Sequence, residues 1–175
     1  MARITERDRI EEFENIQEML NTLEVAAKIL EAGPNLEESC MLISLPTNVE
    51  DWEEEYKEDL HIATGYLIQM GEEENQQTKY LMLYMPVQVD LTSVDELVLL
   101  KLANELNQTL PVGACFVGKD KNSERVLLQI KCFIGGYVEE FLDEGVVCEA
   151  VFELGSIYDR LKEQLLDLVQ QSEQQ

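Results

Sequence analysis

The chain has 175 residues, a length that fits one domain with a packed core and is short for two. Its 36 Asp and Glu residues outnumber its 13 Lys and Arg residues, which gives a formal net charge of -23. A surface with this charge repels phosphate, so the composition argues against binding to nucleic acid or to an anionic membrane.

Residues 4–32 have the pattern of a long amphipathic helix. Thr5, followed by Asp8, is typical of the cap of a first helical turn. Gly33 and Pro34 end the pattern, because Gly accepts a left-handed cap and Pro cannot continue the hydrogen-bond ladder. The apolar residues recur at helical spacing and share one face: Phe13, Ile16, Leu20, Leu23, Ala27 and Leu30.

Three strands are predicted next, at residues 39–45, 60–70 and 80–89. The first is an apolar run that stops at Pro46, and the second alternates so that Ile62, Tyr66 and Ile68 share one face. The third is apolar on both faces, which favours a central strand covered on both sides or an outer face that is covered. The segment between the first two strands, residues 47–59, is dense in Asp and Glu.

A second helix is predicted to begin at the Ser93–Glu96 capping box and to run to about Asn107. Two strands follow, at residues 112–118 and 125–134, around a turn-rich loop. The glycine pair after the second of these strands is expected to close the sheet.

Residues 137–170 are predicted to be helical. Gly145 and Gly155 lower the helix propensity, so we expect a break or bend near one of them. The helical stripe in this segment consists of Val147, Val151, Leu154, Tyr158, Leu161, Leu165 and Leu168.

The predicted order, α-β-β-β-α-β-β-α, indicates one α+β domain over residues 1–175. We expect an antiparallel sheet of about five strands, flanked by helices, because blocks of strands joined by hairpins alternate with helical segments. Neither an internal repeat nor a linker between domains is visible in the sequence.

This element order, together with a local pattern at residues 97–133, resembles the class I type III secretion chaperones and their wider bacterial relatives, the YbjN-like proteins. In the pattern, a helix that ends in Leu106-Asn107 runs into a strand that begins Pro111-Val-Gly113, and a hairpin follows. The acidic segment at 47–59 and the extended final helix depart from the family. The resemblance implies no active site and no cofactor; it implies binding of an extended segment of a partner protein, commonly by a dimer.

Two aromatic residues in the acidic segment, Trp52 and Tyr56, are candidate partner-binding residues, since aromatic anchors ringed by charge suit a basic partner. The alternative is that Trp52 packs into the core, and this alternative is favoured. Residues 50–59 could instead hold a divalent cation in a regulatory domain that responds to metal or to a small ligand. They lack the ligand spacing of a calcium loop, so a solvated loop is favoured and no metal ligand is assigned.

The final helix supplies the other candidates for partner binding: Tyr158, Leu161, Leu165 and Leu168. Their stripe is long for packing against a single sheet, so part of it is a candidate contact for a second subunit or a client. Pairing of this helix with the first helix across the sheet is an equally good interpretation and needs no partner.

The sequence supports no catalytic machinery. It contains no phosphate-binding glycine loop and no motif that would pair His61 with a nucleophile, so His61 is expected at the surface or between strands. It also has no secretory signal, no apolar run long enough to span a bilayer and no paired cysteine motif, which favours a reduced, cytoplasmic protein. We therefore expect a non-enzymatic protein-binding module, chaperone-like or adaptor-like, whose partner is a basic or partly unfolded polypeptide or a second copy of the chain.

Overall fold

The computed structural model describes residues 4–46, 61–69, 78–87, 89–119 and 126–173. These residues form α1 (Glu6–Thr22), β1 (Ala27–Leu30), β2 (Cys40–Ser44), β3 (Ile62–Gln69), β4 (Thr78–Pro86), α2 (Glu96–Asn107), β5 (Ala114–Lys119), β6 (Val126–Tyr137) and α3 (Glu144–Glu173).

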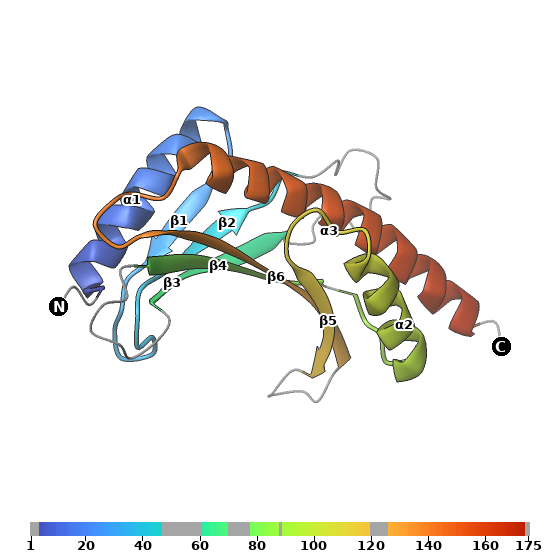
Figure 1. The fold of residues 1–175 in the computed structure, drawn as a ribbon. Helices are drawn as coiled ribbons and strands as arrows, with labels where there is room; N and C mark the ends of the chain where they lie inside the picture. Colours follow the sequence, from blue (N-terminus) through green and yellow to red (C-terminus); the bar gives the residue numbers. More distant parts are fainter. Residues whose placement is uncertain (1–3, 47–60, 70–77, 88, 120–125, 174–175) are drawn as a thin grey trace.

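The described strands form one antiparallel sheet in the order β1-β2-β3-β4-β6-β5. The connection from β4 through α2 to β5 carries the chain past β6, so β5 lies at one edge and β1 at the other. Figure 1 shows the sheet curving beneath α1 and α3, with α2 beside β5. The predicted α+β class is confirmed; the predicted count of five strands is wrong, because β1 was assigned to the first helix.

The first helix ends ten residues earlier than its apolar stripe predicts. The N–H of Val25 donates to the C=O of Leu20 (3.0 Å), and the N–H of Glu24 donates to the C=O of Asn21 (3.1 Å). Glu24 has a φ of 60°, so these bonds form a Schellman cap with a non-glycine residue in the left-handed position. The chain then reverses, and Ala27 to Leu30 pair with β2. The start of α1 is as expected, since Thr5 and Asp8 form a reciprocal capping box.

The C-terminal segment also differs from its prediction. Strand β6 continues through Gly135 and Gly136 to Tyr137, so helix α3 begins seven residues later than expected. The helix then runs without a break past both Gly145 and Gly155. A Cβ atom at Gly155 would lie 2.0 Å from the carbonyl oxygen of Pro46, so glycine is required where α3 meets the end of β2.

The cap of α2 differs from the predicted Ser93–Glu96 box. Asp95 is the N-cap residue, and its side chain accepts a hydrogen bond from the N–H of Leu97 (2.7 Å). The predicted end of the helix near Asn107 is confirmed.

The hydrophobic core lies between α1, α2 and α3 and one face of the sheet. Alternate residues of each strand point toward the helices; in β4 these are Lys79, Leu81, Leu83 and Met85, and the last three are fully buried in the core. Phe13 from α1 and Val151 from α3 are also fully buried in this core. The alternation predicted for β6 is confirmed, because Leu128, Ile130, Cys132 and Ile134 are buried on the same face.

Both edges of the sheet carry an amide side chain from a helix. At the β5 edge, the Asn107 side chain donates to the C=O of Cys115 and accepts from its N–H, both at 2.7 Å. At the β1 edge, Gln17 of α1 donates to the C=O of Ala27 (2.7 Å). These bonds occupy backbone groups that would otherwise be open to another strand.

The Leu-Asn and Pro-x-Gly residues of the local pattern therefore have identifiable structural roles. Asn107 binds the edge of β5 as described, and Gly113 has a φ of 76°, in the left-handed region that favours glycine. A Cβ atom at Gly113 would also lie 2.5 Å from the carbonyl oxygen of Lys131.

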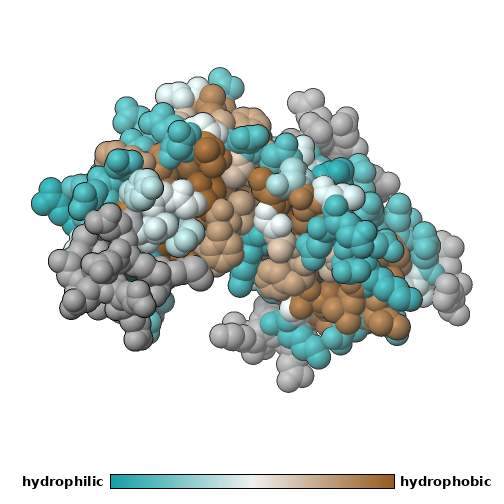
Figure 2. All heavy atoms as spheres, in the orientation of Figure 1, coloured by the Kyte–Doolittle hydropathy of each residue, from teal (hydrophilic) through white to brown (hydrophobic). Residues whose placement is uncertain are grey.

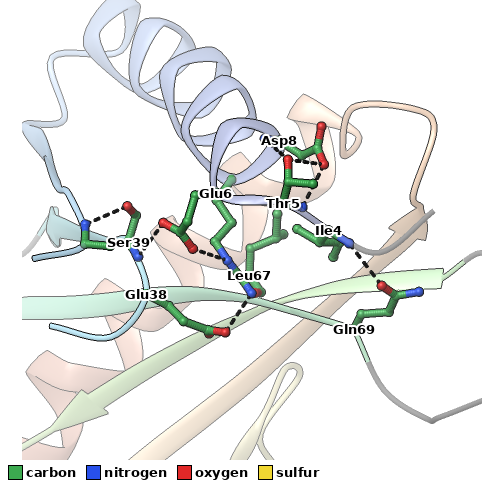
Figure 3. Close-up of polar contacts among 10 residues, drawn as sticks. Ile4, Thr5, Glu6, Asp8, Glu38, Ser39, Leu67 and Gln69 are labelled. Carbon is green, nitrogen blue, oxygen red and sulfur yellow. Dashed lines mark hydrogen bonds and ion pairs between the residues drawn. The ribbon is translucent and has the colours of Figure 1, made fainter. Parts of the chain in front are cut away.

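A polar cluster holds the start of α1 on the sheet (Figure 3). The buried guanidinium of Arg9 donates to the C=O of Leu67 in β3 and pairs with Glu6 (2.8 Å) and Glu38 (2.9 Å). Glu6 also accepts a hydrogen bond from the N–H of Ser39 (3.1 Å). Burial alone would raise the pKa of Glu6, but the hydrogen bonds from Ser39 and the charge of Arg9 outweigh it and lower the pKa below its ordinary value of 4.5.

We expect the Glu6→Gln variant to be less stable than the wild type at pH 7, by a difference that is smaller at pH 3. A carboxyl whose pKa is lowered by folding stabilises the folded state above its unfolded pKa, and this contribution disappears as the pH falls through its folded pKa. Because Glu6 is half exposed, we expect a loss of only about 0.5 kcal/mol at pH 7. Urea unfolding at both pH values measures the difference, with exposed Glu14→Gln as the control. A loss that is equal at pH 3 and pH 7 would contradict the assignment.

Candidate functional site

The second face of the sheet, which we call the open face, is not covered by α1, α2 or α3 (Figure 1). Its residues alternate with the buried ones and are mostly half exposed, as the burial pattern of β3 and β4 shows. Cross-strand register places them in rows across the sheet, one of which joins Tyr66, Met82 and Phe133. The large side chains of the open face include Leu30, Leu42, Ile62, Tyr66, Ile68, Tyr80, Met82, Tyr84, Phe116, Leu127, Gln129, Lys131, Phe133 and Tyr137.

The open face is rich in aromatic rings that water reaches only in part. Phe133 is 49% exposed and Tyr137 is 64% exposed, whereas Tyr66 and Tyr84 are half-buried. Burial, with a smaller contribution from neighbouring Cys40, raises the pKa of Tyr66, so its phenol is neutral at physiological pH. The face therefore offers a broad apolar surface with hydroxyl groups at its tyrosines.

Carboxylates are absent from the described strands, although the chain carries a net charge of -23. Two lysines, Lys28 and Lys131, are the charged strand residues of the open face among those described. The ammonium nitrogen of Lys131 lies 5.0 Å from the ring centre of Phe116 and 5.8 Å from that of Tyr84. The chain's negative charge is thus carried outside these strands.

A second apolar area lies on α2, at the lower right of Figure 2. Leu97, Val98 and Leu100 are all exposed there, while Leu99 and Ala103 of the same helix are buried in the core.

The predicted candidates on the final helix lie in the core of the molecule. Tyr158, Leu161 and Leu165 are fully buried, and Leu168 is partly buried against the same core. A partner could reach the first three only by displacing α3. The stripe on this helix is therefore used within the chain, and these residues do not form an accessible binding surface.

Trp52 and Tyr56 lie outside the described residues, as does the acidic segment 50–59 that was considered for a cation. Within the described ranges, no group of three or more His, Cys, Asp or Glu side chains is placed to hold a metal ion.

His61 is buried, so the predicted surface position is wrong. Its C=O accepts a hydrogen bond from the N–H of Leu45 (2.8 Å), which agrees with the other predicted position, between strands. Its ring centre lies 5.2 Å from that of Tyr158, with the planes tilted by 58°. Asp159 and Lys162 of α3 are buried as well. Each of these four residues has an interaction partner, so none is offered as a catalytic or binding group.

The three buried cysteines are poor nucleophiles. Burial raises the pKa of Cys115 to about 12 and also raises the pKa values of Cys40 and Cys132. Their thiols therefore remain protonated at physiological pH, and only the thiolate is reactive.

A scan against protein-family models found no match to the chain, and a search of curated proteins found none either. In the part of the chain that the structure describes, none of the helices combines the length and apolar character needed to cross a bilayer.

Some of the residues on the open face could be predicted from the sequence to share one face. The apolar alternation of Ile62, Tyr66 and Ile68 identifies one face of β3, and the two-sided apolar pattern of β4 includes Tyr80, Met82 and Tyr84. The predicted central position of β4 is confirmed, since it lies between β3 and β6. The described helices do not provide the predicted cover of its outer face, because all three pack on the other side.

Proposed function

We propose that the chain is a non-enzymatic, cytoplasmic protein-binding module, chaperone-like or adaptor-like, of the kind represented by the secretion chaperones and YbjN-like proteins. Its partner in this proposal is an extended or partly unfolded segment of another polypeptide, which lies across the open face.

The observation that carries the proposal is the contrast between the two faces of the sheet. One face is packed under three helices of the described chain, and the described strands present Tyr, Phe and Met side chains, and no carboxylate, on the other. Exposed apolar surface of this kind, within an otherwise strongly charged chain, is typical of sites that bind other proteins. Aromatic residues and Met are also enriched in the buried centres of protein interfaces.

Charge and cysteine chemistry support the remaining parts of the proposal. A net charge of -23 keeps a chain with an exposed apolar face soluble and steers partners with a net positive charge toward it. All four cysteines are free, as suits a reducing compartment.

The proposal predicts that Phe133→Asp weakens partner binding. A carboxylate at this position on the open face would have to be desolvated on contact, so we expect at least a tenfold loss of affinity, equivalent to about 1.4 kcal/mol. Affinity capture from native cytosol, with partners quantified by mass spectrometry, compares the variant with the wild type. Phe152→Asp on α3 is the matched control, since Phe152 is 43% exposed and Phe133 is 49% exposed.

The expected result is a set of proteins retained by the wild type and by Phe152→Asp but captured more weakly by Phe133→Asp. Circular dichroism and melting temperature establish that both variants are folded, and sedimentation distinguishes a second copy of the chain from another polypeptide. Equal capture by all three chains, or capture of nothing by any of them, would contradict the proposal.

A further inference from the structure

Among the described residues of the open face, Lys131 says most about the chemistry of a binding partner. It lies in β6, between β4 and the edge strand β5, in a row with Thr64, Tyr84 and Ala114. Its ammonium group lies over the rings of Phe116 and Tyr84, and no described carboxylate pairs with it. The other described basic side chain on this face, Lys28, is at the opposite edge of the sheet and exposed.

A polypeptide that covers the open face must displace water from this ammonium group. The two rings already contact it and offset part of the desolvation cost, but rings are weak acceptors compared with water. A charge that is buried without an opposite charge opposes association strongly, whereas an ion pair with additional contacts removes that penalty. The described strands of the open face provide no carboxylate for this ammonium group, and we infer that the partner brings one.

We propose, on the basis of the proposed function, that the segment bound on the open face places a single carboxylate on Lys131 and apolar side chains on its neighbours. In an extended segment, the residues two positions before and after the acid project to the same side. They would meet the aromatic and Met side chains around Lys131, among them Tyr84 and Phe133.

The net charge of the chain limits the partner to few acids. Long-range repulsion by a net charge of -23 disfavours a segment rich in Asp and Glu, while the local contact requires one. The partner segment is therefore apolar, neutral or basic overall, and carries one acidic residue at its centre. A segment that instead placed Lys or Arg against the tyrosines would differ from it in sequence.

Selection from a displayed library of random 12-residue peptides against the full chain tests the proposal. We expect the selected peptides to carry one Asp or Glu with apolar residues two positions away on each side. For a selected peptide, changing its acid to the amide, or changing the chain by Lys131→Met, should weaken binding by about tenfold or more. Met retains an apolar stem over the rings and removes the charge. Lys119→Met, at an exposed lysine on the covered side of β5, is the control and should leave binding unchanged.

The outcomes separate this proposal from the function on which it rests. Peptides that require Phe133 but carry no acid, or that bind Lys131→Met as tightly as the wild type, would overturn the assignment of Lys131 and leave the open face as the binding surface. A selection in which no peptide depends on Phe133 would overturn the proposed function and this inference together.

Discussion

Replacing Gly155 with Ala is expected to lower the free energy of unfolding by about 3 kcal/mol, although Ala is normally the better helix former. The added Cβ would lie 2.0 Å from the carbonyl oxygen of Pro46, so helix α3 would have to move away from the end of β2. Gly155 is itself buried, and its neighbours Leu154 and Tyr158 are fully buried, so this movement would also disturb the core. Urea unfolding, followed by circular dichroism, measures the change.

Gly33→Ala is the matched control for this effect. No atom lies within 4 Å of a Cβ at Gly33, which sits in the turn between β1 and β2. We expect a change of about 0.5 kcal/mol or less, since surface substitutions without strain fall in that range. An equal effect of the two substitutions, or stabilisation by Gly155→Ala, would show that α3 does not depend on this close approach.

Replacing Lys79 with Met is the second change expected to have a large effect. Lys79 of β4 forms a buried ion pair with Glu12 of α1, whose other carboxylate oxygen accepts a hydrogen bond from the N–H of Leu142 (2.9 Å). Removing the lysine leaves the Glu12 carboxylate buried with no opposite charge. We expect a loss of about 3 to 5 kcal/mol, which denaturant unfolding would detect.

The double variant Glu12→Gln, Lys79→Met should recover most of this loss. It removes both charges, and the Gln carbonyl can still accept the hydrogen bond from Leu142, so no ion is buried alone. The coupling energy from the four chains measures the interaction directly. Additive losses in the double variant would mean that the two residues act independently.

The parts of the fold that the sequence predicted well depend on local signals. Thr5 and Asp8 make a capping box with near neighbours, and the strand alternation of Leu128, Ile130 and Cys132 follows from the pleat. Strand β1 was missed because Leu23, Ala27 and Leu30 continue the spacing of the helical stripe. The turn that interrupts them is a left-handed Glu24, a residue type that gives no warning of this conformation.

The candidate site was harder to predict because it depends on long-range pairing. The residues of β4 and β6 that share the open face, such as Met82 and Phe133, are far apart in sequence and meet only through strand register. The stripe of Tyr158, Leu161 and Leu165 predicted an apolar surface correctly, but periodicity does not say whether the chain itself covers that surface. Likewise, Gly155 predicts a break in the helix when only the sequence is considered. The structure shows that a glycine is needed there because α3 passes close to Pro46.

The amide side chains at the two sheet borders have a consequence for concentrated solutions of this protein. Asn107 and Gln17 form hydrogen bonds with outward-facing backbone groups of Cys115 and Ala27. A strand of a neighbouring molecule therefore finds fewer free backbone groups with which to pair. Fraying of α2 would expose the border at Cys115 again. We therefore expect fibre formation to begin from molecules in which α2 has detached from the sheet.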